Sequence, residues 1–243
     1  MTVSLDAIKK IIDQCSEEER KALGKYLRQL SPHPLERSLK VDADTILTAI
    51  ERSSDLTKRG IRGIIAEAVF VNQVIPEVAP LGWQNVSSVG TDHPYDVLLK
   101  KGDQEVRIQV KLQRSLRNLP WFYYRKHYSD EYYVVEVQKT RGGTKAGRPT
   151  RFYRFGDFDL LAVNMHPSSH DWNSFRYTLG AWLLPGDPDS DIEIMQPVAA
   201  IPNSSWTDNF ATCLKWFEEA KQHRVLPELL HRKKRRAKKA KPT

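Results

Sequence analysis

Hydrophobic positions in the first third of the chain recur every three or four residues, the period of a helix packed against an apolar surface. The pattern is found in residues 4–15, 16–30, 42–54 and 56–75. Ser16 and Glu19 have the spacing of a capping box at the start of the second of these segments. This part of the chain is therefore expected to be helical.

The period changes to two after the prolines at 76 and 80, which are expected to stop the last of these helices. Alternating or continuous apolar runs predict strands over 82–89, 95–101, 105–112, 131–138, 158–165 and 176–185, and the helical period returns over 206–223. We predict an α/β (or α+β) fold with a central mixed β-sheet flanked by helices. The expected parts are an N-terminal helical annex over 1–54, a main domain over 55–230 and a basic tail over 231–243.

The positive charge is concentrated in that tail. The whole chain has 38 Lys and Arg against 30 Asp and Glu, and residues 231–243 hold eight cations and no acid, so the remainder has 38 − 8 = 30 cations and is formally neutral. A short cationic segment, expected to be disordered, suits salt-dependent binding to a polyphosphate, although a merely solubilising end is the alternative.

Other features narrow the class of protein. Two cysteines, Cys15 and Cys213, form neither a disulfide framework nor a zinc cluster, and we expect a cytoplasmic protein. The sequence indicates no membrane association, and it contains no phosphate-binding loop or dinucleotide fingerprint, so we expect no nucleotide cofactor.

The segment PYDVLLKKGDQEVRIQVKLQ, residues 94–113, carries the candidate chemistry. Its Gly102-Asp103 turn predicts an antiparallel hairpin. Side chains alternate along a strand, so Gln109 and Lys111 share one face, and Asp96 joins them if the register is suitable. An exposed hairpin with an Asp96–Lys111 ion pair is the alternative reading.

These residue types suit metal-assisted hydrolysis of a phosphodiester. A Mg²⁺ ion takes oxygen ligands, which Asp96, the amide of Gln109 and the backbone carbonyl of Val110 provide. Lys111 would orient the attacking water. The hairpin supplies only one carboxylate, and Glu67 on the preceding predicted helix is the candidate for a second.

The order of these motifs resembles the PD-(D/E)XK nuclease superfamily. PYD at 94–96 is similar to the first half of its motif, QVK at 109–111 to the second with glutamine in the acidic slot, and Glu67 to a helix glutamate found in many members. The resemblance spans roughly residues 55–165. It implies a restriction-endonuclease-like core, a Mg²⁺ cofactor that Mn²⁺ can replace, and products with 5′-phosphate and 3′-hydroxyl ends.

Basic residues near this segment are candidate contacts to double-stranded DNA. They are Arg114 and Arg117, directly after the QVK motif, and Lys139, Arg141, Lys145, Arg148 and Arg151 in a glycine-rich loop. A solvated loop would have the same composition.

The leading functional hypothesis is a Mg²⁺-dependent type II restriction endonuclease. A stand-alone domain without ATPase motifs favours this role, and cleavage of two strands suits a homodimer. A repair or recombination nuclease that selects branched or damaged DNA is one alternative. The other is a non-catalytic DNA-binding protein that keeps the fold, and Gln109 in the acidic slot leaves that possibility open.

Overall fold

The computed structural model describes residues 4–88, 93–117, 119–122, 131–139, 144–145, 148–149, 151–186 and 191–219. Contacts divide the chain into two units, Met1–Gly60 and Ile61–Thr243. The predicted basic tail lies outside the described residues.

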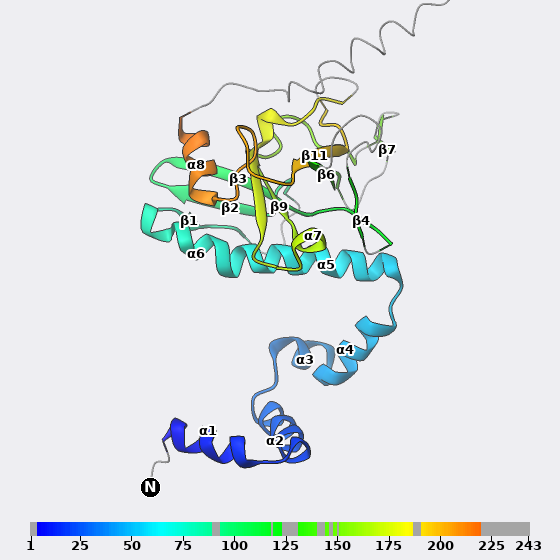
Figure 1. Ribbon diagram of the computed structural model, residues 1–243, viewed down its shortest axis with the longest axis vertical. Helices are drawn as coiled ribbons and strands as arrows, with labels where there is room; N and C mark the ends of the chain where they lie inside the picture. Colours follow the sequence, from blue (N-terminus) through cyan, green and yellow to red (C-terminus); the bar gives the residue numbers. More distant parts are fainter. Residues whose placement is uncertain are drawn as a thin grey trace, which may run out of the picture. The chain divides into compact units, whose positions relative to one another are not determined.

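The N-terminal unit is helical, as the apolar periodicity predicts (Figure 1). Its helices are α1 (Leu5–Gln14), α2 (Glu17–Leu30), α3 (Pro34–Leu39) and α4 (Ala43–Arg52). The predicted capping box is present, because the Ser16 hydroxyl accepts from the Glu19 N–H and the Glu19 carboxylate accepts from the Ser16 N–H. Helix α3 was not predicted; it begins with Pro34 in its first turn, where the missing N–H costs nothing. Over residues 4–52, these helices bury no residue.

A long helical stretch follows and runs through Pro76. It consists of α5 (Asp55–Val69), the π-helical turn η1 (Phe70–Val74), α6 (Ile75–Val78) and the 3₁₀ turn η2 (Ala79–Leu81). The prediction that Pro76 ends the helix is wrong. The wider turn precedes the proline, and the Ile75 N–H bonds to the Phe70 carbonyl, five residues back. The stretch ends instead at Gly82, whose φ is 89°.

The second unit contains a five-stranded mixed sheet with the order β1-β2-β3-β9-β10. The strands are β1 (Gln84–Asn85), β2 (Val97–Lys101), β3 (Gln104–Leu112), β9 (Leu160–Asn164) and β10 (Phe175–Leu179). Neighbours pair antiparallel except β3 and β9, which are parallel. The predicted class, a central mixed sheet flanked by helices, is confirmed.

Shorter elements complete this unit. A two-stranded sheet joins β6 (Tyr132–Glu136) to β11 (Met195–Ala199), and two small hairpins consist of β4 (Ser115–Leu116) with β5 (Leu119–Pro120) and β7 (Thr144–Lys145) with β8 (Arg148–Pro149). The helical elements are α7 (His166–Ser169), η3 (Gly180–Trp182) and α8 (Phe210–Glu218).

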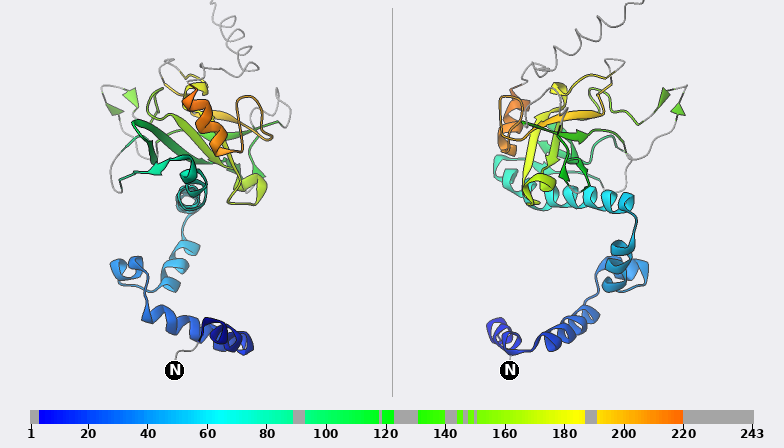
Figure 2. Two further views of the ribbon diagram at one scale, coloured as in Figure 1. Left: turned by 90° about the vertical axis from the view of Figure 1, so that its left-hand side faces the viewer. Right: turned by 45° about the vertical axis from the view of Figure 1, so that its right-hand side comes forward.

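The central sheet separates two apolar cores. On one face, η1, α6 and α8 cover the sheet (Figure 2). In this core the Phe70 and Phe210 rings lie 5.2 Å apart between centroids. The other face of β9 packs with β6 and β11. By length and composition alone, the helical stretch Asp55–Leu81 is apolar enough to cross a membrane. In the structure, its buried residues Phe70, Val74 and Val78 belong to the first core.

Candidate active site

The candidate site lies where the β2–β3 ladder ends. Val97 pairs with Ile108, so continuing the antiparallel register puts Asp96 opposite Gln109. The Asp96 N–H donates to the Ile108 carbonyl at 3.0 Å. Beyond this point the Asp96 side chain replaces the neighbouring strand: its Oδ2 accepts from the Val110 N–H at 2.8 Å and from Gln109 Nε2. The register that the sequence analysis required is therefore present.

Strand parity places the polar residues on the face opposite the helices. Ile108 and Val110 are buried in the core beneath α6, so Gln109 and Lys111 point the other way. Gln109 is only 1 % exposed, and Lys111 is partly buried. This is not the exposed ion-paired hairpin that was the alternative reading.

Glu67 reaches the same group of charges from α5. Ala66 and Phe70 in this helical stretch are buried in the core, and the side chain of Glu67, which follows Ala66, is partly buried. Burial raises the pKa of Glu67, and the negative charge of Asp96 raises it further, whereas the charge of Lys111 lowers it. The charges of Asp96 and Lys111 therefore act on Glu67.

Glu67, Asp96 and Lys111 are all partly removed from water, which disfavours their charged forms. Burial raises the pKa of Asp96, while Lys111 and the hydrogen bonds from Val110 and Gln109 oppose that shift. Burial lowers the pKa of Lys111, and the charges of Asp96 and Glu67 act in the opposite direction. Each group is thus partly deprived of water and stabilised by charges of opposite sign.

The oxygen atoms of this cluster fit a divalent cation. Gln109 Oε1 is buried without a hydrogen-bond partner in the described part of the chain. The Val110 carbonyl lies on the same strand edge as its N–H, next to Asp96, and accepts from Gln109 Nε2 at 3.4 Å. Glu67, whose pKa is raised by the charge of Asp96, is the candidate for a second carboxylate. Such a set of two carboxylates, an amide oxygen and a carbonyl suits Mg²⁺. No group of three or more His, Cys, Asp or Glu side chains suited to a metal exists among the described residues.

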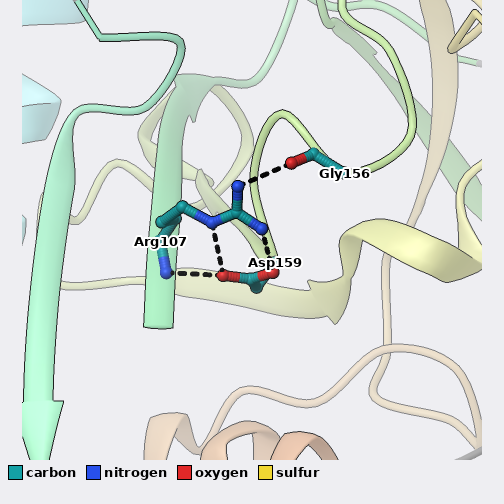
Figure 3. Close-up of polar contacts among 3 residues, drawn as sticks. All are labelled: Arg107, Gly156 and Asp159. Atoms are coloured by element: carbon teal, nitrogen blue, oxygen red, sulfur yellow. Dashed lines mark hydrogen bonds and ion pairs between the residues drawn. The ribbon is translucent and has the colours of Figure 1, made fainter. Parts of the chain in front are cut away.

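The Arg107–Asp159 pair fixes the strand that carries the site (Figure 3). Arg107 Nε and Nη2 donate to the two Asp159 carboxylate oxygens at 2.9 and 2.7 Å, and Nη1 donates to the Gly156 carbonyl at 2.7 Å. Asp159 immediately precedes β9, so this bidentate pair holds the start of β9 against β3. The parallel register then aligns Gln109 with Leu161 and Lys111 with Val163.

Tyr153 is a neighbour of the site that sequence reasoning did not single out. The ammonium groups of Lys111 and Lys139 lie 5.4 and 5.3 Å from its ring centroid. The residue is 5 % exposed, and burial together with the charge of Asp96 raises the pKa of its phenol. Its only signal in the sequence is an aromatic residue within a basic loop.

The predicted DNA contacts are not all equally available. Arg114 pairs with Glu136 and lies over the Trp121 ring at 5.5 Å, and Lys139 pairs with Asp157 at 3.5 Å. Arg151 and Arg117 are exposed. Arg141 lies outside the described residues, and the structure describes only the backbone strands of Lys145 and Arg148.

Comparisons with known proteins show a distant structural likeness. The sequence matches no protein-family profile and none of the curated proteins. Among solved structures, a bacterial homing endonuclease, I-Ssp6803I, overlaps 67 % of this chain and 98 % of its own, with 15 % identity and a TM-score of 0.39. A score this low does not establish a shared fold.

Proposed function

We propose that this protein is a metal-dependent DNA endonuclease related to the PD-(D/E)XK superfamily. One observation carries the proposal: Asp96, Gln109 and Lys111 converge on one face at the end of a strand ladder, within electrostatic reach of Glu67. The unpartnered Gln109 Oε1 supports it, because a buried polar atom without a partner is costly unless a ligand or water satisfies it.

In this proposal the chain holds Mg²⁺ through Asp96, Gln109 Oε1, the Val110 carbonyl and Glu67. The bound ion would polarise the phosphoryl oxygen and lower the pKa of the attacking water. Mn²⁺, which also accepts oxygen ligands, is expected to substitute. Neutralisation of the two carboxylates would offset the burial that raises their pKa values.

Lys111 would position the attacking water and stabilise negative charge at the phosphorus. Burial limits its hydration, and the Tyr153 ring lies beside its ammonium group, so the side chain has few alternative positions. Hydrolysis would leave 5′-phosphate and 3′-hydroxyl ends. We further infer a type II restriction role for a homodimer, with double-stranded DNA as substrate.

Incubation of the purified protein with supercoiled plasmid and long linear DNA tests this function. We expect cleavage with Mg²⁺ and none with EDTA, and sequenced ends that share a short motif would identify a restriction enzyme. Asp96→Ala and Lys111→Ala should lose cleavage. Lys100→Ala and Glu105→Ala are matched controls, because this exposed ion pair lies at the far end of the same hairpin. Undiminished cleavage by Asp96→Ala and Lys111→Ala would refute the site.

A non-catalytic DNA-binding protein is the second candidate, favoured by one contact. Gln109 Nε2 donates to Asp96, so the Asp96 carboxylate has a hydrogen-bond partner without a cation. Salt-sensitive DNA binding that is unaffected by EDTA, with no cleavage in Mg²⁺ or Mn²⁺, would support this candidate over the nuclease. Preferential cleavage of synthetic junctions over plasmid would instead support a repair or recombination role.

A further inference from the structure

The β4–β5 hairpin follows the candidate site directly and carries two exposed leucines. Ser115, at its start, is four residues beyond Lys111. Leu116 pairs with Leu119 across the hairpin, and these side chains are 58 % and 68 % exposed. Exposed Arg117 follows Leu116, so the tip combines a cation with an apolar pair.

The base of the hairpin is fixed to the second unit. The Arg114 N–H donates to the Val134 carbonyl at 2.8 Å, and the Trp121 N–H donates to the Arg114 carbonyl at 2.9 Å. The Arg114 side chain pairs with Glu136 and lies over the Trp121 ring. Exposure is therefore concentrated at the tip, while the base keeps a defined position relative to β3.

Arg117 adopts a backbone conformation that is unfavourable for its residue type. Its φ is 53°, in the left-handed region that glycine and asparagine adopt at lower cost. An arginine is thus held at the tip at the expense of stability, as occurs at functional positions.

Helix α7 contacts β5 and begins at His166, and His170 follows its last residue; the two imidazole rings lie 6.4 Å apart between centroids. Burial lowers the pKa of His166, and the charges of His170 and Arg62 lower it further, although Asp171 opposes them. Because these shifts disfavour the charged form of His166, the cation beside the apolar tip is Arg117. A cation beside an apolar pair suits a polyanion that also offers apolar surface, as duplex DNA does between its base pairs.

We propose that the β4–β5 hairpin is a wedge that enters the minor groove of duplex DNA next to the cleavage site. Leu116 and Leu119 would insert at a base step and partly unstack it, and Arg117 would contact the adjacent phosphates. The placement beside the scissile bond rests on the proposed nuclease function, but insertion into DNA can be tested without cleavage.

Two duplexes of one sequence, fully paired or with a single central mismatch, test the wedge by fluorescence anisotropy in Ca²⁺ instead of Mg²⁺. A mismatched step is easier to unstack, so the wild type should bind that duplex about tenfold more tightly. The double variant L116S/L119S should lose this preference. Ile201→Ser is the matched control, because Ile201 is 77 % exposed elsewhere on the same unit.

The variant Arg117→Asn distinguishes a loss of the contact between Arg117 and DNA from a loss of folding stability. The variant should unfold at a higher temperature, because asparagine tolerates the left-handed conformation, yet bind both duplexes more weakly, with a salt slope reduced by about one. Lys100→Asn should change neither property. Retention of the mismatch preference by L116S/L119S, or of full affinity by Arg117→Asn, would overturn the wedge. Binding with the expected mismatch preference but without cleavage in Mg²⁺ would refute the nuclease proposal and leave the wedge intact.

Discussion

Replacement of Gln109 by glutamate tests the most unusual position of the candidate site. Gln109 Nε2 donates to Asp96 in the native structure, and a carboxylate there would instead face Asp96 with like charge. We expect Gln109→Glu to destabilise the metal-free protein under alkaline conditions and to strengthen its response to divalent cations.

The magnitude follows from the contacts. A hydrogen bond to a charged group contributes about 1.5–3 kcal/mol, and its loss is the first cost. Two charges about 4 Å apart repel by about 4 kcal/mol at an effective dielectric constant of 20, although uptake of one proton by the pair limits that cost. We therefore expect a loss of about 2–4 kcal/mol at about pH 8 in EDTA.

The direction of the pH dependence is fixed by the raised pKa of the new carboxylate pair. An acid whose pKa is higher in the folded state binds its proton more tightly when folded. Stability is therefore retained at low pH and lost as pH rises from the ordinary carboxyl range, about 4, through the raised value. Most of the deficit should disappear at about pH 5, where a shared proton restores the hydrogen bond to Asp96.

Urea denaturation of wild type and Gln109→Glu at these two pH values, each with EDTA or Mg²⁺, measures the effect. Mg²⁺ should stabilise the variant more than the wild type, because only the folded state brings the added carboxylate next to Asp96. Gln109→Leu controls for packing. An equal deficit at both pH values, unaffected by Mg²⁺, would show a packing defect and refute the electrostatic reasoning.

Three further predictions use other parts of the chain. Burial lowers the pKa of Lys111 from its ordinary value of 10.5, so the folded state binds this proton less tightly than the unfolded state does. The free energy of unfolding of the wild type should therefore rise with pH up to about 10.5. Denaturation curves of Lys111→Met at the same pH values should lack this rise. Both amide atoms of Gln113 are buried without partners among the described residues, so Gln113→Leu should increase the free energy of unfolding by about 1–2 kcal/mol, and a decrease would indicate a bound water. Deletion of residues 231–243 removes eight cations. The slope of log binding constant against log salt concentration for non-specific DNA should become shallower by up to about seven, at about 0.9 for each cation. An unchanged slope would exclude the tail from DNA binding.

Several misses in the predicted secondary structure have local physical causes. Strand β11 contains Pro197, which weakens a strand signal, and it is tolerated because β11 pairs only with β6 in its two-stranded sheet. Pro76 is a helix breaker by residue type, but the π-helical turn before it shifts the hydrogen bonding by one residue. In both cases the neighbouring backbone decides how the proline is accommodated.

Local patterns in the sequence were enough to predict the half of the candidate site that lies on one hairpin. Side chains alternate along a strand regardless of context, so Gln109 and Lys111 had to share a face, and the Gly102-Asp103 turn set β2 antiparallel to β3. Helical periodicity likewise predicted α1, α2, α4 and α5, because it depends only on neighbours three and four positions away.

The distant residues that join that hairpin depend on how the chain folds. The charge of Asp96 acts on Glu67 from a separate element, and the Tyr153 ring centroid lies 5.4 and 5.3 Å from the ammonium groups of Lys111 and Lys139. Arg114, a candidate DNA contact by sequence, pairs with Glu136 on β6. Local pattern cannot contain such information, since each contact depends on how separate elements pack around the two cores.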